Sequence, residues 1–329
     1  MSRVSGTISK IIAGVGISAA LASIIYDNIK GRQGEDDAKA EAPGDSRQGQ
    51  PISCVVKLGG SACTVKDEFE TANVALIDAT ASQLSQVVSE GIQPLLIHGA
   101  GSFGHFQARE YSVSSGGDLA VGRLREGFAR TRISVQQLNN LIVSRLVHFG
   151  LPAVGLSPGA HLHTSSRTIL SDSTSAIVLL DRISRFVEEG FLPVSHGDAC
   201  LDSTLNCTIL SGDALFVWYC RVYRPKYAVF LTDVAGVYSK PPTEPDAQLI
   251  RSIQVNHLGE RMNLETANVT TATRSHDVTG GIAAKLKVAC QVAGELKIPV
   301  YIVQAGSLAA AQALRGQRPD VGTTVECVA

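Results

Sequence analysis

Short runs of β-branched and apolar residues alternate with longer amphipathic segments from Ile52 to the end of the chain. The short runs predict strands over Ser53–Leu58, Pro94–His98, Ala153–Leu156, Phe191–Ser195, Tyr227–Thr232 and Pro299–Val303, with Thr323–Val328 as an edge strand. The longer segments predict helices over Thr71–Glu90, with Val74, Ile77, Leu84 and Val87 on one face, and over Arg125–Phe149, Ser173–Glu189 and Gly281–Leu296. Such alternation predicts an α/β fold, an open sandwich whose mainly parallel sheet carries helices on both faces.

The first 51 residues have a different pattern from the rest of the chain. An apolar segment, Ile11–Tyr26, is flanked by Lys10 and Lys30, and a run rich in Gly, Asp, Glu, Lys, Pro and Gln follows it to Pro51. That run predicts a disordered linker, because it has little to bury. The 16 apolar or small residues are short for a membrane span, which needs about 20. A membrane anchor, an organelle-targeting presequence and a non-functional extension all stay open.

Residues 239–276 also lack a clear pattern outside Gln248–Val255. The segment is rich in Pro, Thr, Asn and charged residues. Long stretches of this kind inside a compact domain are typical of loops that cover a site. We therefore predict a mobile lid here.

Composition and charge narrow the partners. The 29 Lys and Arg nearly balance the 30 Asp and Glu, leaving a formal charge of −1. No overall field attracts nucleic acid or an acidic membrane surface, so an anion site has to be local. The seven cysteines are scattered and form no C-x-x-C pair, which argues against a disulfide framework and a structural zinc. We expect a reducing, intracellular compartment.

Three glycine-bearing loops supply the candidate chemistry. Lys57–Ser61 reads Lys-Leu-Gly-Gly-Ser, and His98–His105 reads His-Gly-Ala-Gly-Ser-Phe-Gly-His. Asp277–Gly281 reads Asp-Val-Thr-Gly-Gly and is followed by Lys285. Glycines let backbone N–H groups approach an anion without an intervening Cβ, and a neighbouring lysine adds positive charge. Two loops end strands and the third opens a helix, so we predict a site for several phosphates at the carboxyl edge of the sheet.

Two common phosphate sites do not explain these loops. Gly99–Gly104 matches G-x-G-x-x-G, but no acidic residue ends a second strand about 20 residues later, as dinucleotide binding requires. The following residues, Tyr111–Gly122, are rich in Ser and Gly instead. The P-loop motif G-x-x-x-x-G-K-[ST] and the protein-kinase motifs are absent from the chain. Phosphate binding here must use another architecture.

The charged residues beside these loops suit phosphoryl transfer. Lys57 and Lys285 lie on different loops and can flank a transferring group from two sides, where charge neutralisation is the main requirement. His105 closes the second loop next to His98 and can donate hydrogen bonds to an anion. Carboxylates at strand exits can orient lysines, hold Mg²⁺ through water, contact a ribose or cap a helix; they are Asp198, Asp213 and Asp233.

Six motifs in this order resemble the amino acid kinase superfamily. They are Lys57–Ser61, His98–His105, Ser195–Asp198, Ile209–Asp213, Thr232–Tyr238 and Asp277–Lys285. Within the superfamily, the Gly-Ser-Phe-Gly-His ending of the second loop is similar to the isopentenyl phosphate kinase subfamily. The resemblance covers residues 52–329. Alternatives that remain open are a kinase of the same fold with another small acceptor and a non-catalytic nucleotide sensor.

The resemblance implies a fold, a reaction and a set of roles. It implies the open αβα sandwich of the family, with an acceptor lobe over about residues 52–200 and a nucleotide lobe over about 201–329. It implies ATP with Mg²⁺, transfer of the γ-phosphoryl group to isopentenyl phosphate for isoprenoid synthesis, and a homodimer. The expected nucleotide contacts are Lys57, Gly59, Gly60, Ser61, Gly101, Asp233, Gly281 and Lys285, whereas Ala100, Gly101, His105 and Gly212 are expected to hold the acceptor phosphate. Asp213 is expected to orient the lysines and Lys66 to lie near the phosphates.

Overall fold

The core of the protein is one eight-stranded sheet. The computed structural model describes residues 52–120, 122–262 and 281–328. The strand order is β10-β12-β11-β9-β1-β2-β6-β3, and neighbouring strands are parallel except β11 with β12. The bounds are β1 (Cys54–Leu58), β2 (Pro94–His98), β3 (Ala153–Leu156), β6 (Leu192–His196), β9 (Tyr227–Thr232), β10 (Ser252–Val255), β11 (Val300–Gln304) and β12 (Thr323–Cys327).

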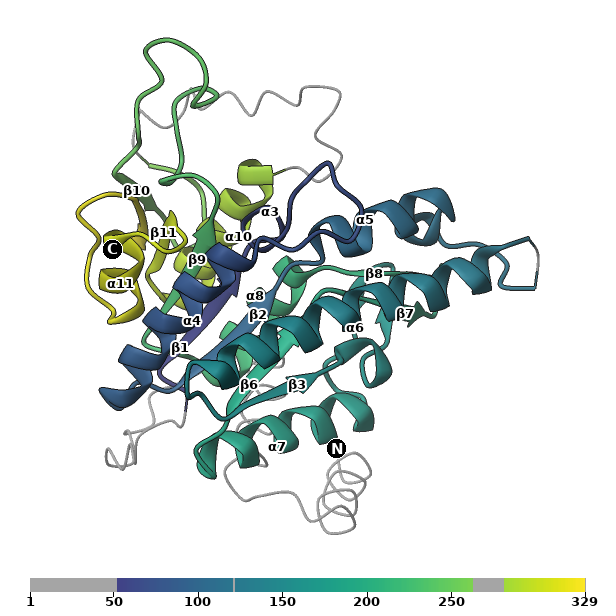
Figure 1. Cartoon of the computed structure of the whole chain (residues 1–329). Helices are drawn as coiled ribbons and strands as arrows, with labels where there is room; N and C mark the ends of the chain where they lie inside the picture. Colours follow the sequence, from purple (N-terminus) through teal and green to yellow (C-terminus); the bar gives the residue numbers. More distant parts are fainter. Residues whose placement is uncertain (1–51, 121, 263–280, 329) are drawn as a thin grey trace, which may run out of the picture.

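Helices cover both faces of this sheet. One face packs against α4 (Val74–Ser89), α6 (Leu124–His148) and α11 (Leu308–Leu314). The other face packs against α7 (Thr174–Glu188), α8 (Gly212–Tyr223) and α10 (Gly281–Leu296). Side chains alternate across the sheet, so Val56 of β1 joins the first layer and Val55 joins the second. Figure 1 shows α4 and α6 in front of the sheet, and the predicted αβα sandwich is confirmed.

A smaller, four-stranded sheet is formed by segments that lie between β3 and α8 in the sequence. Its order is β5-β4-β7-β8, with β4 (Thr164–Ser165), β5 (Thr168–Ile169), β7 (Asp198–Asp202) and β8 (Asn206–Leu210). Around it lie α5 (Gly101–Glu110), η1 (Val113–Ser115) and η2 (Pro158–Ala160), whereas the short helix α3 (Gly60–Cys63) packs against α4 and α5. The sequence pattern did not predict the small sheet or α5. The two-residue strands β4 and β5 are too short for a pattern, and β7 begins and ends with a buried aspartate.

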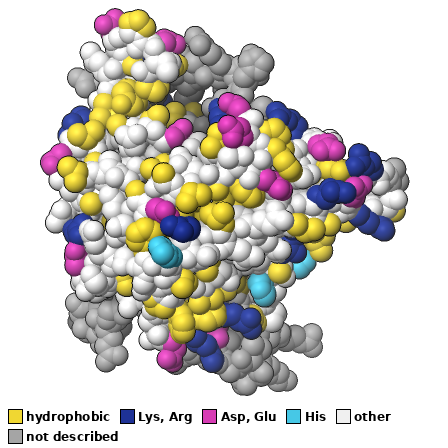
Figure 2. Space-filling model, viewed as in Figure 1, with side chains coloured by type: hydrophobic (Ala, Val, Ile, Leu, Met, Phe, Trp, Pro, Cys, Tyr) yellow, Lys and Arg dark blue, Asp and Glu magenta, His cyan; other side chains and the backbone are white. Residues whose placement is uncertain are grey.

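Charged side chains of both signs gather at the end of the molecule where α6 begins (Figure 2). Glu126, in the first turn of α6, accepts hydrogen bonds from Arg123 and Arg130 at 3.0 and 2.7 Å. Each of these exposed pairs joins a positive and a negative side chain, so this end of the molecule does not present a surface of one sign. They also hold the pKa of the Glu126 carboxyl well below its usual range, at about 2.

The predicted long elements are confirmed, with two corrections. Val74 begins α4 but is 42% exposed, so it does not join the buried face formed by Ile77, Leu84 and Val87. The strand predicted at the edge over Thr323–Val328 lies inside the sheet, because β12 pairs with β11 on one side and β10 on the other. The edge strand is β10, which comes from the segment predicted to be a lid.

Several predictions fall on residues outside the described ranges. They concern the apolar segment 11–26, the linker that follows it, residues 263–276 of the predicted lid, and 277–280 of the third glycine loop. Within the ranges that the structure describes, no helix combines the length and apolar character that crossing a bilayer needs. The N-terminal alternatives stay predictions. The division into an acceptor lobe and a nucleotide lobe also stays a prediction, because one sheet runs through both.

Candidate active site

The first two glycine loops meet at the carboxyl edge of four neighbouring strands. The order β9-β1-β2-β6 brings the exits of these strands into one row. Backbone hydrogen bonds join them: Gly59 N donates to Leu231 O at 2.8 Å, Gly99 N to Leu58 O at 2.9 Å, and Gly197 N to His98 O at 3.1 Å. The chain leaves β1 toward β2 on one side, while β9 lies on the other. Such a reversal is where open α/β sheets bind ligands.

The first two loops touch through their backbones, and only glycine allows this. A Cβ on Gly60 would lie 2.6 Å from Gly101 N, and one on Gly99 would lie 2.5 Å from Gly60 N. Gly101 has φ +50°, a conformation that L side chains rarely adopt. Any larger residue at Gly60 or Gly99 would therefore push the two loops apart.

Thr64 joins these two loops and was missed by the sequence interpretation. Its hydroxyl donates to Gly60 O at 2.8 Å and accepts from Ser102 N at 3.0 Å. The side chain is 2% exposed. No motif distinguishes a single threonine four residues after a glycine, so only the fold identifies it as a clamp.

The first turns of α5 and α8 also point into this region. The first N–H groups of a helix have no intrahelical acceptor and attract anions. A Cβ on Gly197 would lie 3.3 Å from Gly212 N and 3.9 Å from Ala100 N, so both helix starts flank Gly197. The N-cap of α8 is Ser211, whose hydroxyl accepts from Ala214 N at 3.1 Å. The alternative of an Asp213 cap is thus wrong.

Lys57 is a buried lysine aimed at this region. It is 4% exposed, and its Nζ lies 2.9 Å from Asp213 Oδ1 and 5.5 Å from the centre of the Phe230 ring. Because a buried charge needs a partner, Asp213 holds the ammonium in place. Gly212 leaves room for the lysine, since a Cβ there would lie 2.9 Å from Lys57 Cε.

Lys285 reaches the first loop from α10. Its Cε lies 3.6 Å from the position that a Cβ on Gly59 would take. The first loop is also tied to the exit of β9, because Ser61 Oγ donates to Asp233 Oδ1 at 2.9 Å. The structure therefore brings Lys285 to the loop that contains Lys57. The catalytic roles of the two lysines stay predictions. Gly281 begins α10.

The two histidines of the second loop have opposite surroundings. His98 is fully buried, with Nδ1 3.0 Å from Gly99 O and Nε2 3.1 Å from Asn139 Oδ1. Burial, with the neighbouring His196 ring, lowers the pKa of His98 to about 3, so the ring is neutral. His105 is exposed in the second turn of α5. It does not close the loop as predicted, because the helix already begins at Gly101.

Two other predicted residues have surroundings of their own. Asp198 is 1% exposed, and its carboxylate accepts from Arg132 Nε at 3.2 Å, Ser157 Oγ at 2.8 Å and Gly159 N at 3.0 Å. It anchors the wall between α6 and β7, and the roles predicted for it stay predictions. Lys66 lies on an exposed turn after α3. Its role stays a prediction.

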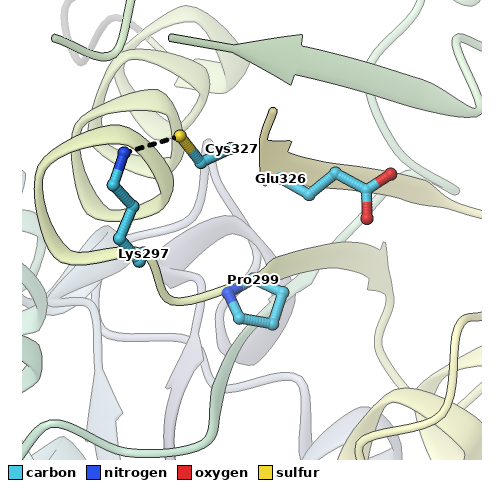
Figure 3. A pocket seen from close by; sticks show the side chains of 4 residues that line it. All are labelled: Lys297, Pro299, Glu326 and Cys327. Carbon is cyan, nitrogen blue, oxygen red and sulfur yellow. Dashed lines mark hydrogen bonds between the residues drawn. The ribbon is translucent and has the colours of Figure 1, made fainter. Parts of the chain in front are cut away.

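A separate hollow of about 380 Å³ lies at the opposite edge of the sheet. Its lining residues are Lys297, Pro299, Glu326 and Cys327 (Figure 3). Pro299 precedes β11 and Cys327 ends the antiparallel β12, so the hollow lies at the amino ends of the parallel strands. Lys297 Nζ is 2.9 Å from Cys327 Sγ. No glycine loop of the carboxyl edge contributes to this lining.

Comparison with known families agrees with this geometry. The family model described as the amino acid kinase family matches residues 53–304, which include the first two loops, both lysines and all the strands that end at the site. The chain belongs to the amino acid kinase family. The resemblance seen in the glycine motifs is thereby confirmed.

Several relatives of this amino acid kinase are isopentenyl phosphate kinases. The chain is 36% identical over 313 residues to an isopentenyl phosphate kinase of Arabidopsis thaliana, covering 82% of this chain and 92% of the relative. It is 34% identical over 239 residues to an isopentenyl phosphate kinase of Methanothermobacter thermautotrophicus, covering 71% and 84%. A solved isopentenyl phosphate kinase structure matches with a TM-score of 0.67 at 29% identity, over 82% of this chain and 99% of the other.

Proposed function

We propose that this protein transfers the γ-phosphoryl group of ATP to isopentenyl phosphate, forming isopentenyl diphosphate and ADP. The observation that carries the proposal is the ion pair between buried Lys57 and half-buried Asp213, beside the contact between Gly60 and Gly101. It places a fixed positive charge where two loops of backbone N–H groups meet. The similarity to isopentenyl phosphate kinases supports the choice of acceptor.

The acceptor requires no general base. A phosphate monoester has a second pKa of about 6 and is largely a dianion at neutral pH. One of its oxygens can attack the γ-phosphorus directly, and the bond from that phosphorus to the bridging oxygen of ADP breaks in line. Catalysis then consists of positioning and charge neutralisation.

The two anions would occupy different parts of the carboxyl edge. We place the ATP phosphates against Lys57, Lys285 and the first loop, with the contacts Gly59, Gly60, Ser61, Gly101, Asp233 and Gly281. We place the acceptor phosphate between the starts of α5 and α8, with the contacts Ala100, Gly101, His105 and Gly212. The apolar tail would then lie toward α5 and α6, which pack together.

Mg²⁺ fits this arrangement as an ion carried on the nucleotide. Across the described ranges, no three His, Cys, Asp or Glu side chains gather as a metal cage. Mg²⁺ in kinases usually keeps several waters and takes one or two carboxylates with the phosphates. Asp213 and Asp233, at the starts of α8 and of the loop after β9, are the carboxylates at this edge. The ion would screen the repulsion between the two phosphates.

A direct assay tests the proposal. The full chain would be given ATP, Mg²⁺ and, in parallel, isopentenyl phosphate, dimethylallyl phosphate, glutamate, acetylglutamate or UMP, with products followed by ³¹P NMR. We expect diphosphate from the isoprenoid monophosphates alone. Turnover of another acceptor would keep the lysines and overturn the acceptor assignment. Nucleotide binding without any turnover would favour the sensor alternative.

Assembly and location are separate proposals. We infer a homodimer from family resemblance and contact between residues 11–26 and a membrane from their apolar composition. Sedimentation of the full chain would measure the first, and flotation with and without residues 1–51 would measure the second. An organelle-targeting role would instead show as cleavage of that segment in cells.

A further inference from the structure

Two buried histidines end neighbouring strands beside the acceptor loop. His98 ends β2 and His196 ends β6, and the two residues are paired in register. Their rings stack with centroids 5.4 Å apart and an interplanar angle of 24°. Each ring places Nδ1 near the carbonyl oxygen of the next glycine, at 3.0 Å for Gly99 and 2.9 Å for Gly197. The repeated geometry indicates one common tautomer.

Counting protons identifies that tautomer. A neutral imidazole has one N–H group, and a carbonyl oxygen can only accept. A bond from the ring to Gly99 O therefore requires the proton on Nδ1 of His98. The same holds for Gly197 O and His196, whose buried Nε2 meets no hydrogen-bond partner in the described chain. A bare ring nitrogen tolerates that position better than an unsatisfied N–H group.

Asn139 is the group that completes this arrangement for His98. In the orientation present, Asn139 Oδ1 lies 3.1 Å from His98 Nε2, so both neighbours of the ring are acceptors. A half-turn of the amide keeps its shape and brings Nδ2 to Nε2. Asn139 then donates to Nε2, and His98 donates from Nδ1 to Gly99 O. Both ring nitrogens of His98 then have a hydrogen-bond partner.

The surroundings of Asn139 indicate a specific role. It is 5% exposed and interrupts the apolar stripe of α6 formed by Val135, Leu138 and Ile142. A buried amide in such a stripe costs free energy unless it is hydrogen-bonded. Gly155 of β3 leaves the space it fills, because a Cβ there would overlap the Asn139 amide.

We propose that Asn139, acting through His98, is a positioning residue that aims the N–H group of Ala100 at the acceptor phosphate. In a trans peptide, the C=O of Gly99 and the N–H of Ala100 point in opposite directions. Holding Gly99 O toward the buried His98 ring therefore directs the Ala100 N–H outward. Ala100 N lies 3.9 Å from the position of a Gly197 Cβ, in the gap flanked by Gly212. This inference rests on the proposed function.

The expected effect is confined to one substrate. Asn139→Leu keeps a similar volume but removes the donor, so His98 can take the other tautomer and release Gly99 O. We expect kcat/KM for isopentenyl phosphate to fall about 10- to 100-fold, because a hydrogen bond to a charged group is lost or misdirected. The KM for ATP should change less than about two-fold, since Lys57, Lys285 and the first loop are untouched.

The control is the neighbouring residue on the same helix. Asn140 is exposed, and Asn140→Leu makes the same chemical change outside the stripe. It should leave both KM values unchanged. An Asn139→Leu protein that folds and keeps the wild-type KM for isopentenyl phosphate would overturn the proposal. An equal rise in both KM values would also overturn it and indicate a merely structural role.

If Asn139→Leu fails to fold, a measurement on the wild-type protein still tests the proposal. Long-range ¹H–¹⁵N NMR of the imidazoles should show neutral His98 with its proton on Nδ1, whereas a proton on Nε2 would refute the relay. Adding isopentenyl phosphate without ATP should shift the Ala100 amide signal, and no shift would count against the proposal. Wild-type protein that binds the acceptor but never phosphorylates it would instead refute the proposed function alone.

Discussion

The two edges of the central sheet each contain a lysine, yet their surroundings differ in every respect that matters for phosphate. At the carboxyl edge, Lys57 is 4% exposed, belongs to a strand, and is held by a carboxylate at 2.9 Å. At the amino edge, Lys297 is exposed, follows α10 in a left-handed conformation of φ +59°, and contacts a thiol. Only the first lysine is held rigidly.

The electrostatics of the helices reinforce the contrast. The starts of α5 and α8 meet the glycine loops, and helix starts carry partial positive charge. Lys297 directly follows the end of α10, where the carbonyl groups carry partial negative charge. The Lys297 ammonium therefore stabilises the end of the helix. The neighbouring carbonyl groups make this position a poor binding site for an anion. The direction of the helices, more than the presence of a lysine, therefore marks the catalytic edge.

The largest expected effect comes from replacing Lys57 by methionine, with the same replacement at Lys297 as the control. Lys57→Met should lower kcat by about 10²- to 10³-fold, because a fixed charge is removed from the transferring group. The affinity for ATP should fall much less. Lys297→Met, the same change at the other edge, should leave kcat unaltered. Steady-state kinetics with nucleotide titration would measure both, and equal losses of kcat and affinity in Lys57→Met would contradict a catalytic role.

Glycine substitutions provide the second comparison. Gly60→Ala places a Cβ 2.6 Å from Gly101 N and should cost about 1–3 kcal/mol of stability through overpacking. Gly91→Ala, at the amino end of β2, meets no atom within 4 Å but is strained by its φ of +85°, at about 1–2 kcal/mol. The stability losses, measured by urea unfolding, should thus be similar. Activity should fall in Gly60→Ala alone, and loss in both would argue that stability governs activity.

A smaller, pH-dependent effect is expected in the β7–β8 hairpin beside the carboxyl edge. Asp202 is 3% exposed, and burial raises its pKa. Hydrogen bonds from Thr164, Arg167, Leu205 and Thr204 outweigh this effect and hold the pKa below its ordinary value. The carboxylate therefore stabilises the fold above the unfolded pKa of about 4 and loses this contribution as the pH falls toward the folded pKa.

Asp202→Asn measures that contribution. The substitution should cost about 1–3 kcal/mol at pH 7, because a charged acceptor of several N–H and O–H groups is removed. The gap in melting temperature between wild type and variant should narrow as the pH falls below about 4. A gap that stays constant between pH 7 and pH 3 would show that the charge of Asp202 contributes nothing.

The smallest effect on activity is expected at Cys327, the amino-edge thiol. It is partly exposed, whereas the other six cysteines are buried. Burial raises the pKa of the Cys54 and Cys63 thiols to about 12, and only thiolates react readily. Iodoacetamide should therefore label Cys327 first, as mass spectrometry would show, with little change in kcat. Loss of activity on labelling, absent in Cys327→Ser, would connect the two edges.

The sheet and its helices could be predicted because burial leaves a long, regular pattern. Helix α6 was expected over Arg125–Phe149 and spans Leu124–His148, and β2 was expected over Pro94–His98, the range it occupies. The hairpin of β7 and β8 could not be predicted, since Asp198 and Asp202 of β7 are buried through their own hydrogen bonds. Burial of polar residues breaks the rule on which the pattern depends.

The site was predicted in the same uneven way. Glycine next to lysine is a local signal, so Lys57, Gly59 and Gly60 could be found in the sequence. Asn139 gave a weaker signal, a polar residue within an apolar helical stripe, that was not recognised. Thr64 gave none. His105 was assigned to the end of a loop because α5 was not anticipated, and its contact with the acceptor stays a prediction.

The sequence by itself determined the long helices, the strands of the main sheet, the glycine positions and the family, because each depends on residues that are close along the chain. Tertiary structure decided which of these residues act together. Lys57 and Asp213 are 156 positions apart and come within 2.9 Å, and Asn139 meets His98 across the sheet face. Strand order and helix direction bring these residues into contact, and neither property is encoded in any short segment.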